Sequence, residues 1–468
     1  MKKIGKLKTL KSDEISLKSH ASIGFECLDR ELFEPDRCYD ILAETGVKYA
    51  RVQTGWNRCE LKKGVYTFEW LDDIVDNLLN RGIQPWFNVG YGNPVYMENA
   101  TNPTAVGCVP LYYGEETLKA WENYIEALAK HFSGRISHYE IWNEPDSGWF
   151  WVPEGPNGAE YARFVDLTGD IIRKNDKNAK IGACMSGISA PSHYCLPGIP
   201  GDFFRLFVQN IKKLDFFCYH RYTLRPDVDI AKDVAFIRKG FALNGFNNVE
   251  IWGGECGYGS YIPDGHSLSP IGHGSEHQQA VALLRYFLTD AAVGARLTSF
   301  YTVADYTKKI YETAVGKTEM ALFGIIDDNE YKPKMACKAL SYISNIMSCD
   351  MTVADRYATV VSHIKPYINM PMQPFFASFN RNGKPCYGYY YPQYLEDEAG
   401  LYDHDFHIHL QNMYEEDKMV DPVAVDSLTG DVYEPVSISN SKYVTILRGM
   451  PVAEYPIFII ERSEIEIE

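Results

Sequence analysis

The fold of this chain follows from one stretch of its sequence, Ser137-His138-Tyr139-Glu140-Ile141-Trp142-Asn143-Glu144-Pro145-Asp146. The first part is apolar and β-favouring, which predicts a short buried strand. Because Pro145 has no backbone N–H to donate to a sheet, the strand has to end there. The pattern therefore places Glu144 at the carboxyl end of a strand, directly after an amide side chain, Asn143.

A second stretch has the same pattern, Asn248-Val249-Glu250-Ile251-Trp252-Gly253-Gly254-Glu255-Cys256-Gly257. It is again β-favouring, and its Glu255 lies among glycines that let substrate or neighbouring backbone come close. Barrel enzymes carry their chemistry at the carboxyl ends of their strands. Two glutamates at two such ends are what a retaining glycosidase needs, one as proton donor and the other as nucleophile.

The chain around these stretches alternates strands with helices. Besides the strand that ends at Pro145, strands are predicted at residues 21–27, 47–56, 83–91, 179–185, 214–222, 249–256 and 295–305. Helices are predicted at residues 36–46, 68–80, 115–132, 159–174, 202–211, 230–243, 276–293 and 334–347. Eight strand–helix units predict an α/β fold with a parallel (β/α)8 barrel. An open doubly wound sheet is the alternative, disfavoured because no strand precedes a Gly-x-Gly-x-x-Gly turn.

The pattern changes after about residue 349. Short alternating strands follow at residues 376–379, 386–390, 406–410, 423–425 and 457–460, with turn pairs such as Asn382-Gly383 between them. This spacing predicts a small antiparallel β-sandwich. We therefore expect a barrel at residues 21–349 and a sandwich at 350–468. Residues 1–20 are charged and form either a tail or a strand lent to the sandwich.

Composition excludes several classes of partner. The formal net charge of −16 argues against nucleic acid and anionic membrane surfaces. The basic start, residues 1–8, is followed by charged residues rather than an apolar segment, so we expect no secretion signal and no membrane span. The 11 cysteines are odd in number and scattered, which favours reduced thiols and a cytoplasmic location. Whether the chain forms a homo-oligomer stays open.

Further polar and aromatic residues are placed near the two glutamates by strand periodicity. Arg51 shares a strand face with Gln53, and His220 shares one with Tyr222, because side chains alternate with period two. Trp149 and Trp151 lie in the loop after Pro145 and either stack on a sugar or pack the loop.

The chain resembles the retaining (β/α)8 glycoside hydrolases, and most closely glycoside hydrolase family 39, which holds β-xylosidases and α-iduronidases. The segments that carry the resemblance follow one another in order along most of the chain. They are Tyr49-Ala50-Arg51, Trp142-Asn143-Glu144-Pro145-Asp146, Asp215-Phe216-Phe217-Cys218-Tyr219-His220-Arg221-Tyr222, Gly254-Glu255, Ser299-Phe300-Tyr301-Thr302-Val303-Ala304-Asp305, Tyr331-Lys332-Pro333 and Glu454-Tyr455-Pro456.

The resemblance implies roles for these residues. Glu144 would be the acid/base, Glu255 the nucleophile and Asn143 the partner of the sugar 2-hydroxyl. Arg51, His220, Tyr222 and Tyr301 would line the site, and no metal or cofactor is implied. Three departures from the family, Gln53, Cys256 and Tyr301, surround the sugar pocket and put the substrate in question more than the chemistry.

The expected substrate is a glycoside or short oligosaccharide of a β-linked neutral sugar. A non-catalytic carbohydrate-binding protein on the same fold is the first alternative, and Glu144→Gln separates the two by keeping binding and abolishing turnover. A barrel lyase or metal-dependent hydrolase is the second alternative. Loss of activity in chelator would favour it, since a pair of carboxylates needs no metal.

Overall fold

The structure is a computed structural model of the 468-residue chain. It describes residues 1–100, 102–187, 200–223, 225–264, 266, 272–307, 320–362, 373–392, 401 and 406–468.

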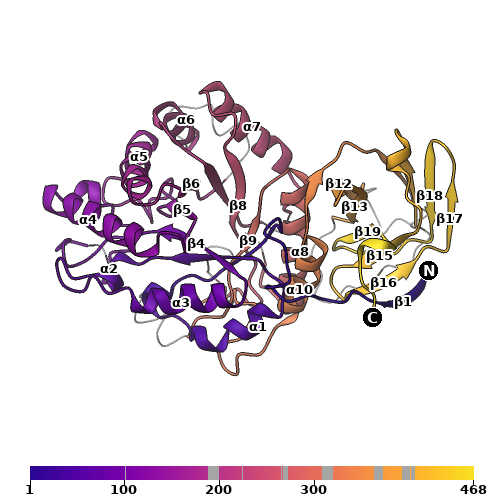
Figure 1. The fold of residues 1–468 in the computed structure, drawn as a ribbon, viewed down its shortest axis with the longest axis horizontal. Coiled ribbons are helices and arrows are strands. Elements are labelled where there is room, and N and C mark those ends of the chain that lie inside the picture. Colours follow the sequence, from indigo (N-terminus) through magenta and orange to yellow (C-terminus); the bar gives the residue numbers. More distant parts are fainter. Residues whose placement is uncertain are drawn as a thin grey trace.

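The amino-terminal three quarters of the chain form a closed barrel of parallel strands in the order β2-β3-β4-β5-β6-β7-β8-β9 (Figure 1). The strands are β2 (Ala21–Gly24), β3 (Tyr49–Gln53), β4 (Gln84–Val89), β5 (His138–Ile141), β6 (Lys180–Met185), β7 (Phe216–Arg221), β8 (Glu250–Cys256) and β9 (Thr298–Phe300). Parallel pairing of β2 with β9, from Ala21 opposite Thr298, closes the ring. The predicted barrel is confirmed.

Helices surround the barrel as the apolar periodicity predicts. They are α1 (Tyr39–Ala43), α2 (Trp56–Cys59), α3 (Glu69–Asn80), α4 (Glu115–Phe132), α5 (Gly158–Asn175), α6 (Pro200–Asn210), α7 (Ile230–Leu243), α8 (Glu276–Ala292) and α10 (Met335–Ile346). The helix predicted at 36–46 is instead a 3-10 turn, Pro35–Arg37, followed by the short α1. Pro35 starts the turn, and Gly46, at φ +69°, ends the segment before β3.

The barrel interior changes character along its axis. Below the carboxyl ends of the strands, part of it is filled by a buried apolar cluster of Trp86, Cys184, Phe216, Cys218, Trp252 and Leu297. Towards the carboxyl ends the buried side chains are charged or polar, namely Arg51, Glu140 and His220. Buried charged side chains occur where they are paired with one another. We therefore expect the site in this charged layer, at the carboxyl ends of the strands.

The remaining strands form two antiparallel sheets, as predicted for a β-sandwich. The first has the order β1-β16-β15-β19-β13-β12-β10 and the second β11-β14-β18-β17. Their bounds are β1 (Lys2–Lys6), β10 (Met351–Val353), β11 (Ala358–Ser362), β12 (Phe375–Arg381), β13 (Lys384–Tyr390), β14 (Phe406–Gln411), β15 (Pro422–Asp426), β16 (Asp431–Glu434), β17 (Ser437–Asn440), β18 (Val444–Arg448) and β19 (Ile457–Glu461). Strand β1 pairs antiparallel with β16, so the amino-terminal segment contributes a strand to the sandwich.

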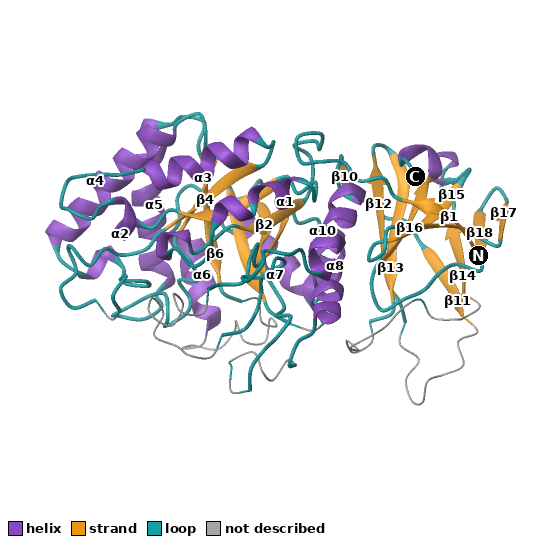
Figure 2. Ribbon diagram, turned by 90° about the horizontal axis from the view of Figure 1, so that it is seen from below, coloured by secondary structure: helices purple, strands orange, loops and turns teal. Residues whose placement is uncertain are grey.

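Helices α8 and α10 lie between the barrel strands and the larger sheet (Figure 2). At this junction Arg285 of α8 donates through Nε to the backbone oxygen of Glu454, at 2.7 Å. His277 of the same helix lies 3.1 Å from the Glu454 carboxyl. Among the described residues, no helix is both long enough and apolar enough to cross a membrane.

Candidate active site

Glu144 lies three residues beyond the end of β5 and turns into the mouth of the barrel. Trp142 and Glu144 both adopt left-handed backbone conformations, at φ +69° and +44°. Such conformations cost non-glycine residues roughly 1–3 kcal/mol each and gather at functional sites. The Trp142 ring is buried and donates through Nε1 to the oxygen of Phe150 at 2.5 Å, so it holds the turn and offers no face to a ligand.

Glu255 is the second-last residue of β8, and two glycines before it make its position accessible. A Cβ on Gly254 would lie 2.5 Å from the Cβ of Cys218, and one on Gly253 would lie 2.2 Å from Asp290. The pairing of β8 shifts register against both neighbouring strands at this point. The glycines therefore allow the close backbone approach that the sequence pattern predicts.

Arg51 is fully buried and connects the carboxyl groups of the site. Its Nε donates to Glu140 at 2.7 Å, and its Nη2 donates to Asn143 Oδ1 at 2.8 Å. A single nitrogen, Nη1, donates to both Glu26 Oε1 at 3.0 Å and Glu255 Oε2 at 2.6 Å. Arg51, on β3, thus joins side chains from the ends of β2, β5 and β8, and it lies beside Glu255.

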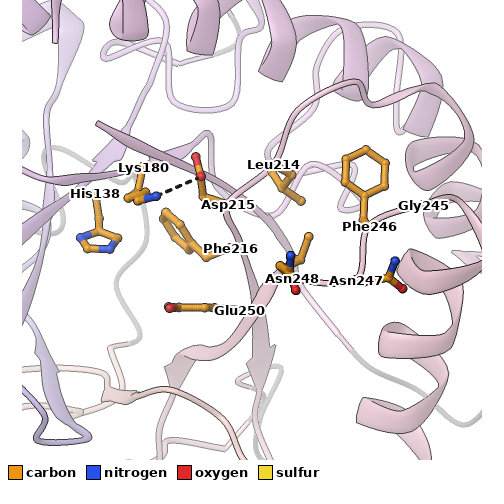
Figure 3. A pocket seen from close by; sticks show the side chains of 11 residues that line it. His138, Lys180, Leu214, Asp215, Phe216, Gly245, Phe246, Asn247, Asn248 and Glu250 are labelled. Atoms are coloured by element: carbon orange, nitrogen blue, oxygen red, sulfur yellow. Dashed lines mark ion pairs between the residues drawn. The ribbon is translucent and has the colours of Figure 1, made fainter. Parts of the chain in front are cut away.

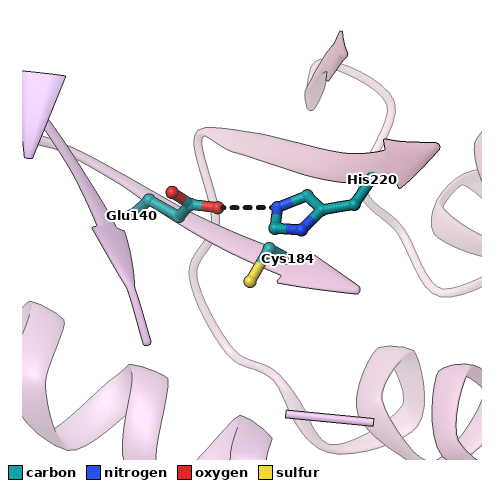
Figure 4. A group of neighbouring side chains, drawn as sticks. All are labelled: Glu140, Cys184 and His220. Atoms are coloured by element: carbon teal, nitrogen blue, oxygen red, sulfur yellow. Dashed lines mark ion pairs between the residues drawn. The ribbon is translucent and has the colours of Figure 1, made fainter. Parts of the chain in front are cut away.

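His220, on β7, lies beside three carboxyl groups of the site. Its Nδ1 is 2.9 Å from Glu144 Oε1 and 3.7 Å from Glu255 Oε2, and its Nε2 is 3.6 Å from Glu140 Oε1. Figure 4 shows the imidazole pointing at Glu140, with Cys184 beside the pair. The arrangement gives each imidazole nitrogen a carboxylate neighbour, which favours the doubly protonated ring.

Tyrosines complete the far side of the site. Tyr222 donates to Glu255 Oε1 at 2.7 Å. The hydroxyl of Tyr301 lies 2.5 Å from that of Tyr306, and its ring lies 5.5 Å from the ring of Phe323. Both predicted tyrosines therefore reach the site.

The pKa values of the buried groups are moved in opposite directions. Burial raises the pKa of Glu144, and the charge of Glu255 adds to this, while His220 acts against it. Burial also opposes ionisation of Glu140, but Arg51 and His220 outweigh it and lower the pKa of Glu140 to about 2. Burial works against a charged imidazole at His220, yet Glu255, Glu140 and Glu144 together raise its pKa to about 10.

Glu144 and Glu255 open on one pocket of about 420 Å³ at the carboxyl ends of the strands. Its lining includes Glu26, Asn143, Glu144, Tyr222, Glu255 and Tyr301. Ligand pockets of this kind are clefts of roughly 300–1,000 Å³ with a few convergent polar groups. The pocket therefore has the size and polarity of a small-molecule site.

Two predicted ligand contacts lie outside this pocket. Trp149 is 75% exposed on the loop surface. Trp151 is fully buried, donates through Nε1 to Tyr112 at 2.8 Å, and packs edge-on against Trp142 and Tyr161. The structure does not bring either tryptophan to the lining of the pocket, because the loop uses Trp151 as core and turns Trp149 outward.

The residues of the site that were not predicted as site residues from the sequence include Glu26, Arg30, Tyr91 and Glu140. The first three line the pocket with Gln53, and Glu140 lies beneath it. Gln53 accepts from Arg30 at 3.0 Å and donates to Tyr91 at 3.1 Å. Strand periodicity could have indicated Glu140, since it stands two residues before Trp142 and four before Glu144 in the same stretch.

In the part of the chain that the structure describes, two triads have spacings that could hold a cation, Glu140-Cys184-His220 and Glu144-His220-Glu255. In both, His220 is shared, and its Nδ1 is already within hydrogen-bond distance of Glu144. Arg51 contacts a carboxylate of each triad and supplies positive charge there. The donor set is therefore balanced by the protein's own cations rather than left open for a metal.

A second pocket, of about 370 Å³, lies at the opposite end of the barrel (Figure 3). Its lining includes His138, Lys180, Phe216 and Glu250, the first residues of β5, β6, β7 and β8. In barrels, residues at this amino-terminal face serve stability, whereas chemistry belongs to the other face. We therefore assign the candidate active site to the pocket that holds Glu144 and Glu255.

Comparison with known proteins shows a partial sequence match to one enzyme family. A family model described as glycosyl hydrolases family 39 matches residues 37–233, which include Arg51, Asn143, Glu144 and His220 but not Glu255. A curated β-xylosidase of Geobacillus stearothermophilus is 25% identical over 174 residues, or 34% of this chain and 31% of that enzyme. The match thus spans less than a third of that relative's length.

Two solved structures extend the likeness to the whole fold. A family 39 glycoside hydrolase of the gut symbiont Bacteroides cellulosilyticus WH2 is 14% identical with a TM-score of 0.63, covering 95% of this chain and 81% of that one. The family 39 enzyme of Xanthomonas axonopodis pv. citri is 15% identical with a TM-score of 0.56, covering 97% and 95%. The chain is similar in fold to barrel glycoside hydrolases. Within that class its sequence match is to family 39, and the resemblance predicted from the sequence is confirmed.

Proposed function

We propose that the chain is a retaining glycosidase that hydrolyses β-linked neutral sugars, with Glu144 as acid/base and Glu255 as nucleophile. The observation that carries the proposal is one distance. One carboxylate oxygen of Glu144, one of Glu255 and one ring nitrogen of His220 all lie within 4.8 Å of one another. Glu144 and Glu255 both line one pocket. Retaining enzymes hold their carboxyl groups ~5–5.5 Å apart, whereas inverting enzymes leave roughly 6.5–9.5 Å for a water.

The charges around the pair support the division of roles. Burial and the neighbouring Glu255 raise the pKa of Glu144, as a proton donor requires. Glu255 accepts hydrogen bonds from Arg51 at 2.6 Å and Tyr222 at 2.7 Å, which favour its ionised form. Glu144 would protonate the leaving oxygen while Glu255 attacks the anomeric carbon, and Glu144 would then deprotonate the water that releases the sugar.

Neighbouring residues fit supporting parts in this scheme. His220 would orient the Glu144 carboxyl through Nδ1. Arg51 occupies Oδ1 of Asn143, so the amide Nδ2, which has no partner among the described residues, is available to a sugar 2-hydroxyl. Hydrogen bonds to that hydroxyl strengthen in the oxocarbenium-like transition state. The β-xylosidase relative supports a neutral, β-linked glycone.

The proposal is tested with a panel of aryl β-glycosides of neutral sugars. Turnover of at least one sugar is expected, with retention of anomeric configuration in the first-formed product. Glu144→Gln should lose ~100-fold or more with poor leaving groups and much less with dinitrophenolate, which departs without a proton. Chelator should leave the rate unchanged. Sugar binding without turnover would favour the carbohydrate-binding alternative, and inversion would contradict the assignment of Glu255.

A further inference from the structure

Glu26 is a carboxyl group that the proposed mechanism does not use. It follows β2 by two residues, its side chain is only 2% exposed, and it lines the same pocket as Glu144 and Glu255. Its Oε1 accepts from Arg51 Nη1, the nitrogen that also donates to Glu255 Oε2. Glu26 therefore flanks the proposed nucleophile on the side away from Tyr222's contact with Oε1.

The second oxygen of Glu26 is unused by the protein. No hydrogen bond to Oε2 is found among the described residues, and this oxygen is not one of the buried side-chain atoms that lack a partner, so it opens on the pocket. A ligand that closed over it without pairing it would leave a buried polar group unsatisfied, at a cost of roughly 1–3 kcal/mol. The neighbouring Gln53 differs, because its oxygen accepts from Arg30 and its amide donates to Tyr91. Glu26 therefore has an acceptor and donor position left for a ligand.

A purely structural role as counter-charge for Arg51 does not account for Glu26. Arg51 already contacts Glu140 at 2.7 Å and Glu255 at 2.6 Å. With His220 protonated, two buried cations then face two carboxylates without any charge from Glu26. Burial, opposed by Arg51 but assisted by Glu255 and Glu140, raises the pKa of Glu26 to about 8. The carboxyl therefore keeps its proton at neutral pH and can donate a hydrogen bond.

We propose that Glu26 hydrogen-bonds a hydroxyl of the sugar that is bound against Glu255, and so selects sugars that carry this hydroxyl. The inference rests on the proposed glycosidase function and adds a specificity-determining contact to it. A site built around a buried hydrogen-bonding group discriminates strongly against analogues that lack the matching hydroxyl, because the group is then left unpaired.

The test compares Glu26→Gln with Glu26→Met, two side chains of similar length of which only the first forms strong hydrogen bonds. The substrates are the aryl glycoside that the wild type turns over fastest and its monodeoxy analogues. In the wild type, one analogue should lose ~10–100-fold in kcat/KM. Glu26→Met should lose about as much on the parent glycoside and nothing further on that analogue. Glu26→Gln should keep the wild-type preference.

Glu454→Met is the control, because it removes a buried carboxyl outside the pocket lining, and it should leave the ratio of parent to deoxy substrate unchanged. An equal loss on every substrate in Glu26→Met would overturn the inference, since that is the signature of a structural role. Loss of the preference in Glu26→Gln would also overturn it.

A binding experiment separates this inference from the proposed function. Calorimetric titration of Glu144→Gln, with and without Glu26→Met, with the parent and deoxy methyl glycosides needs no turnover. A preference for the parent sugar that vanishes with Glu26→Met upholds the contact even if the wild type hydrolyses nothing. In the opposite result, the wild type hydrolyses the glycoside while Glu26→Met changes the preference for the parent sugar neither in kcat/KM nor in binding. That result upholds the proposed function and overturns the contact.

Discussion

At the scale of single residues, the site is a balance of buried charge around Arg51 and His220. Glu140, with a pKa lowered to about 2, is a permanent anion, whereas the pKa of Glu144 is raised. The difference arises because Arg51 donates directly to Glu140 and not to Glu144. The same short stretch of sequence therefore holds two glutamates with opposite protonation behaviour.

This balance predicts the effect of removing His220. The protonated imidazole lowers the pKa of Glu144 by stabilising its carboxylate, so loss of that charge raises the pKa. Because the proposed mechanism needs Glu144 protonated, the alkaline limb of kcat/KM should move to higher pH in His220→Asn. A pH profile with an activated and a non-activated aryl glycoside measures this.

The shift should appear with the non-activated substrate and be small with the activated one, which does not need the acid. A move of the alkaline limb to lower pH would contradict the contact between His220 and Glu144 as the source of the effect.

At the scale of elements, the end of β8 is the most demanding segment. Gly254 packs so closely on Cys218 of β7 that a Cβ would lie 2.5 Å from it. Gly254→Ala should therefore cost roughly 1–3 kcal/mol of stability through overpacking, and should displace Glu255. Thermal unfolding and kcat/KM both check this.

Gly148→Ala is the matched control, because a Cβ there meets nothing within 4 Å and the backbone is not in the left-handed region. It should leave both quantities nearly unchanged. Equal behaviour of the two variants would show that the register shift at β8 does not depend on the glycine.

The sequence was most informative about the positions of the strands and helices. Period-two runs and stops such as Pro145 located the eight barrel strands, and Glu144 and Glu255 follow directly from them. Glu26 could not be assigned in the same way, since nothing in its own stretch marks it. It meets Arg51 because β2 pairs with β3, and it comes near Glu255 because the barrel closes between β2 and β9. For Trp151 the sequence left both alternatives open, because a loop aromatic looks the same whether it packs inward or meets a sugar.

At the scale of the whole molecule, the barrel and the sandwich meet through buried polar contacts. Glu454, fully buried, lies beside His277 and Arg285 of α8. Removing one partner of such a cluster leaves buried charge unpaired, at a cost of about 3–5 kcal/mol. Glu454→Gln should therefore lower the melting temperature by several degrees.

Turnover at 25 °C should stay within about twofold of the wild type in this variant, because Glu454 is not part of the pocket lining. A fall in kcat/KM without loss of stability would show that the sandwich acts on the site itself. Calorimetry and initial rates on the same preparation distinguish the two results.

The central claim is that Glu255 is the nucleophile of a double displacement. The most direct measurement is peptide mass spectrometry after incubation with a 2-deoxy-2-fluoro glycoside of the turned-over sugar, activated at the anomeric carbon. The fluorine slows breakdown of a glycosyl ester, so a covalent intermediate accumulates. We predict one sugar per chain, attached to Glu255, and no label in Glu255→Ala. Label on Glu26 or Glu140, or an inverted product formed without any label, would contradict the account.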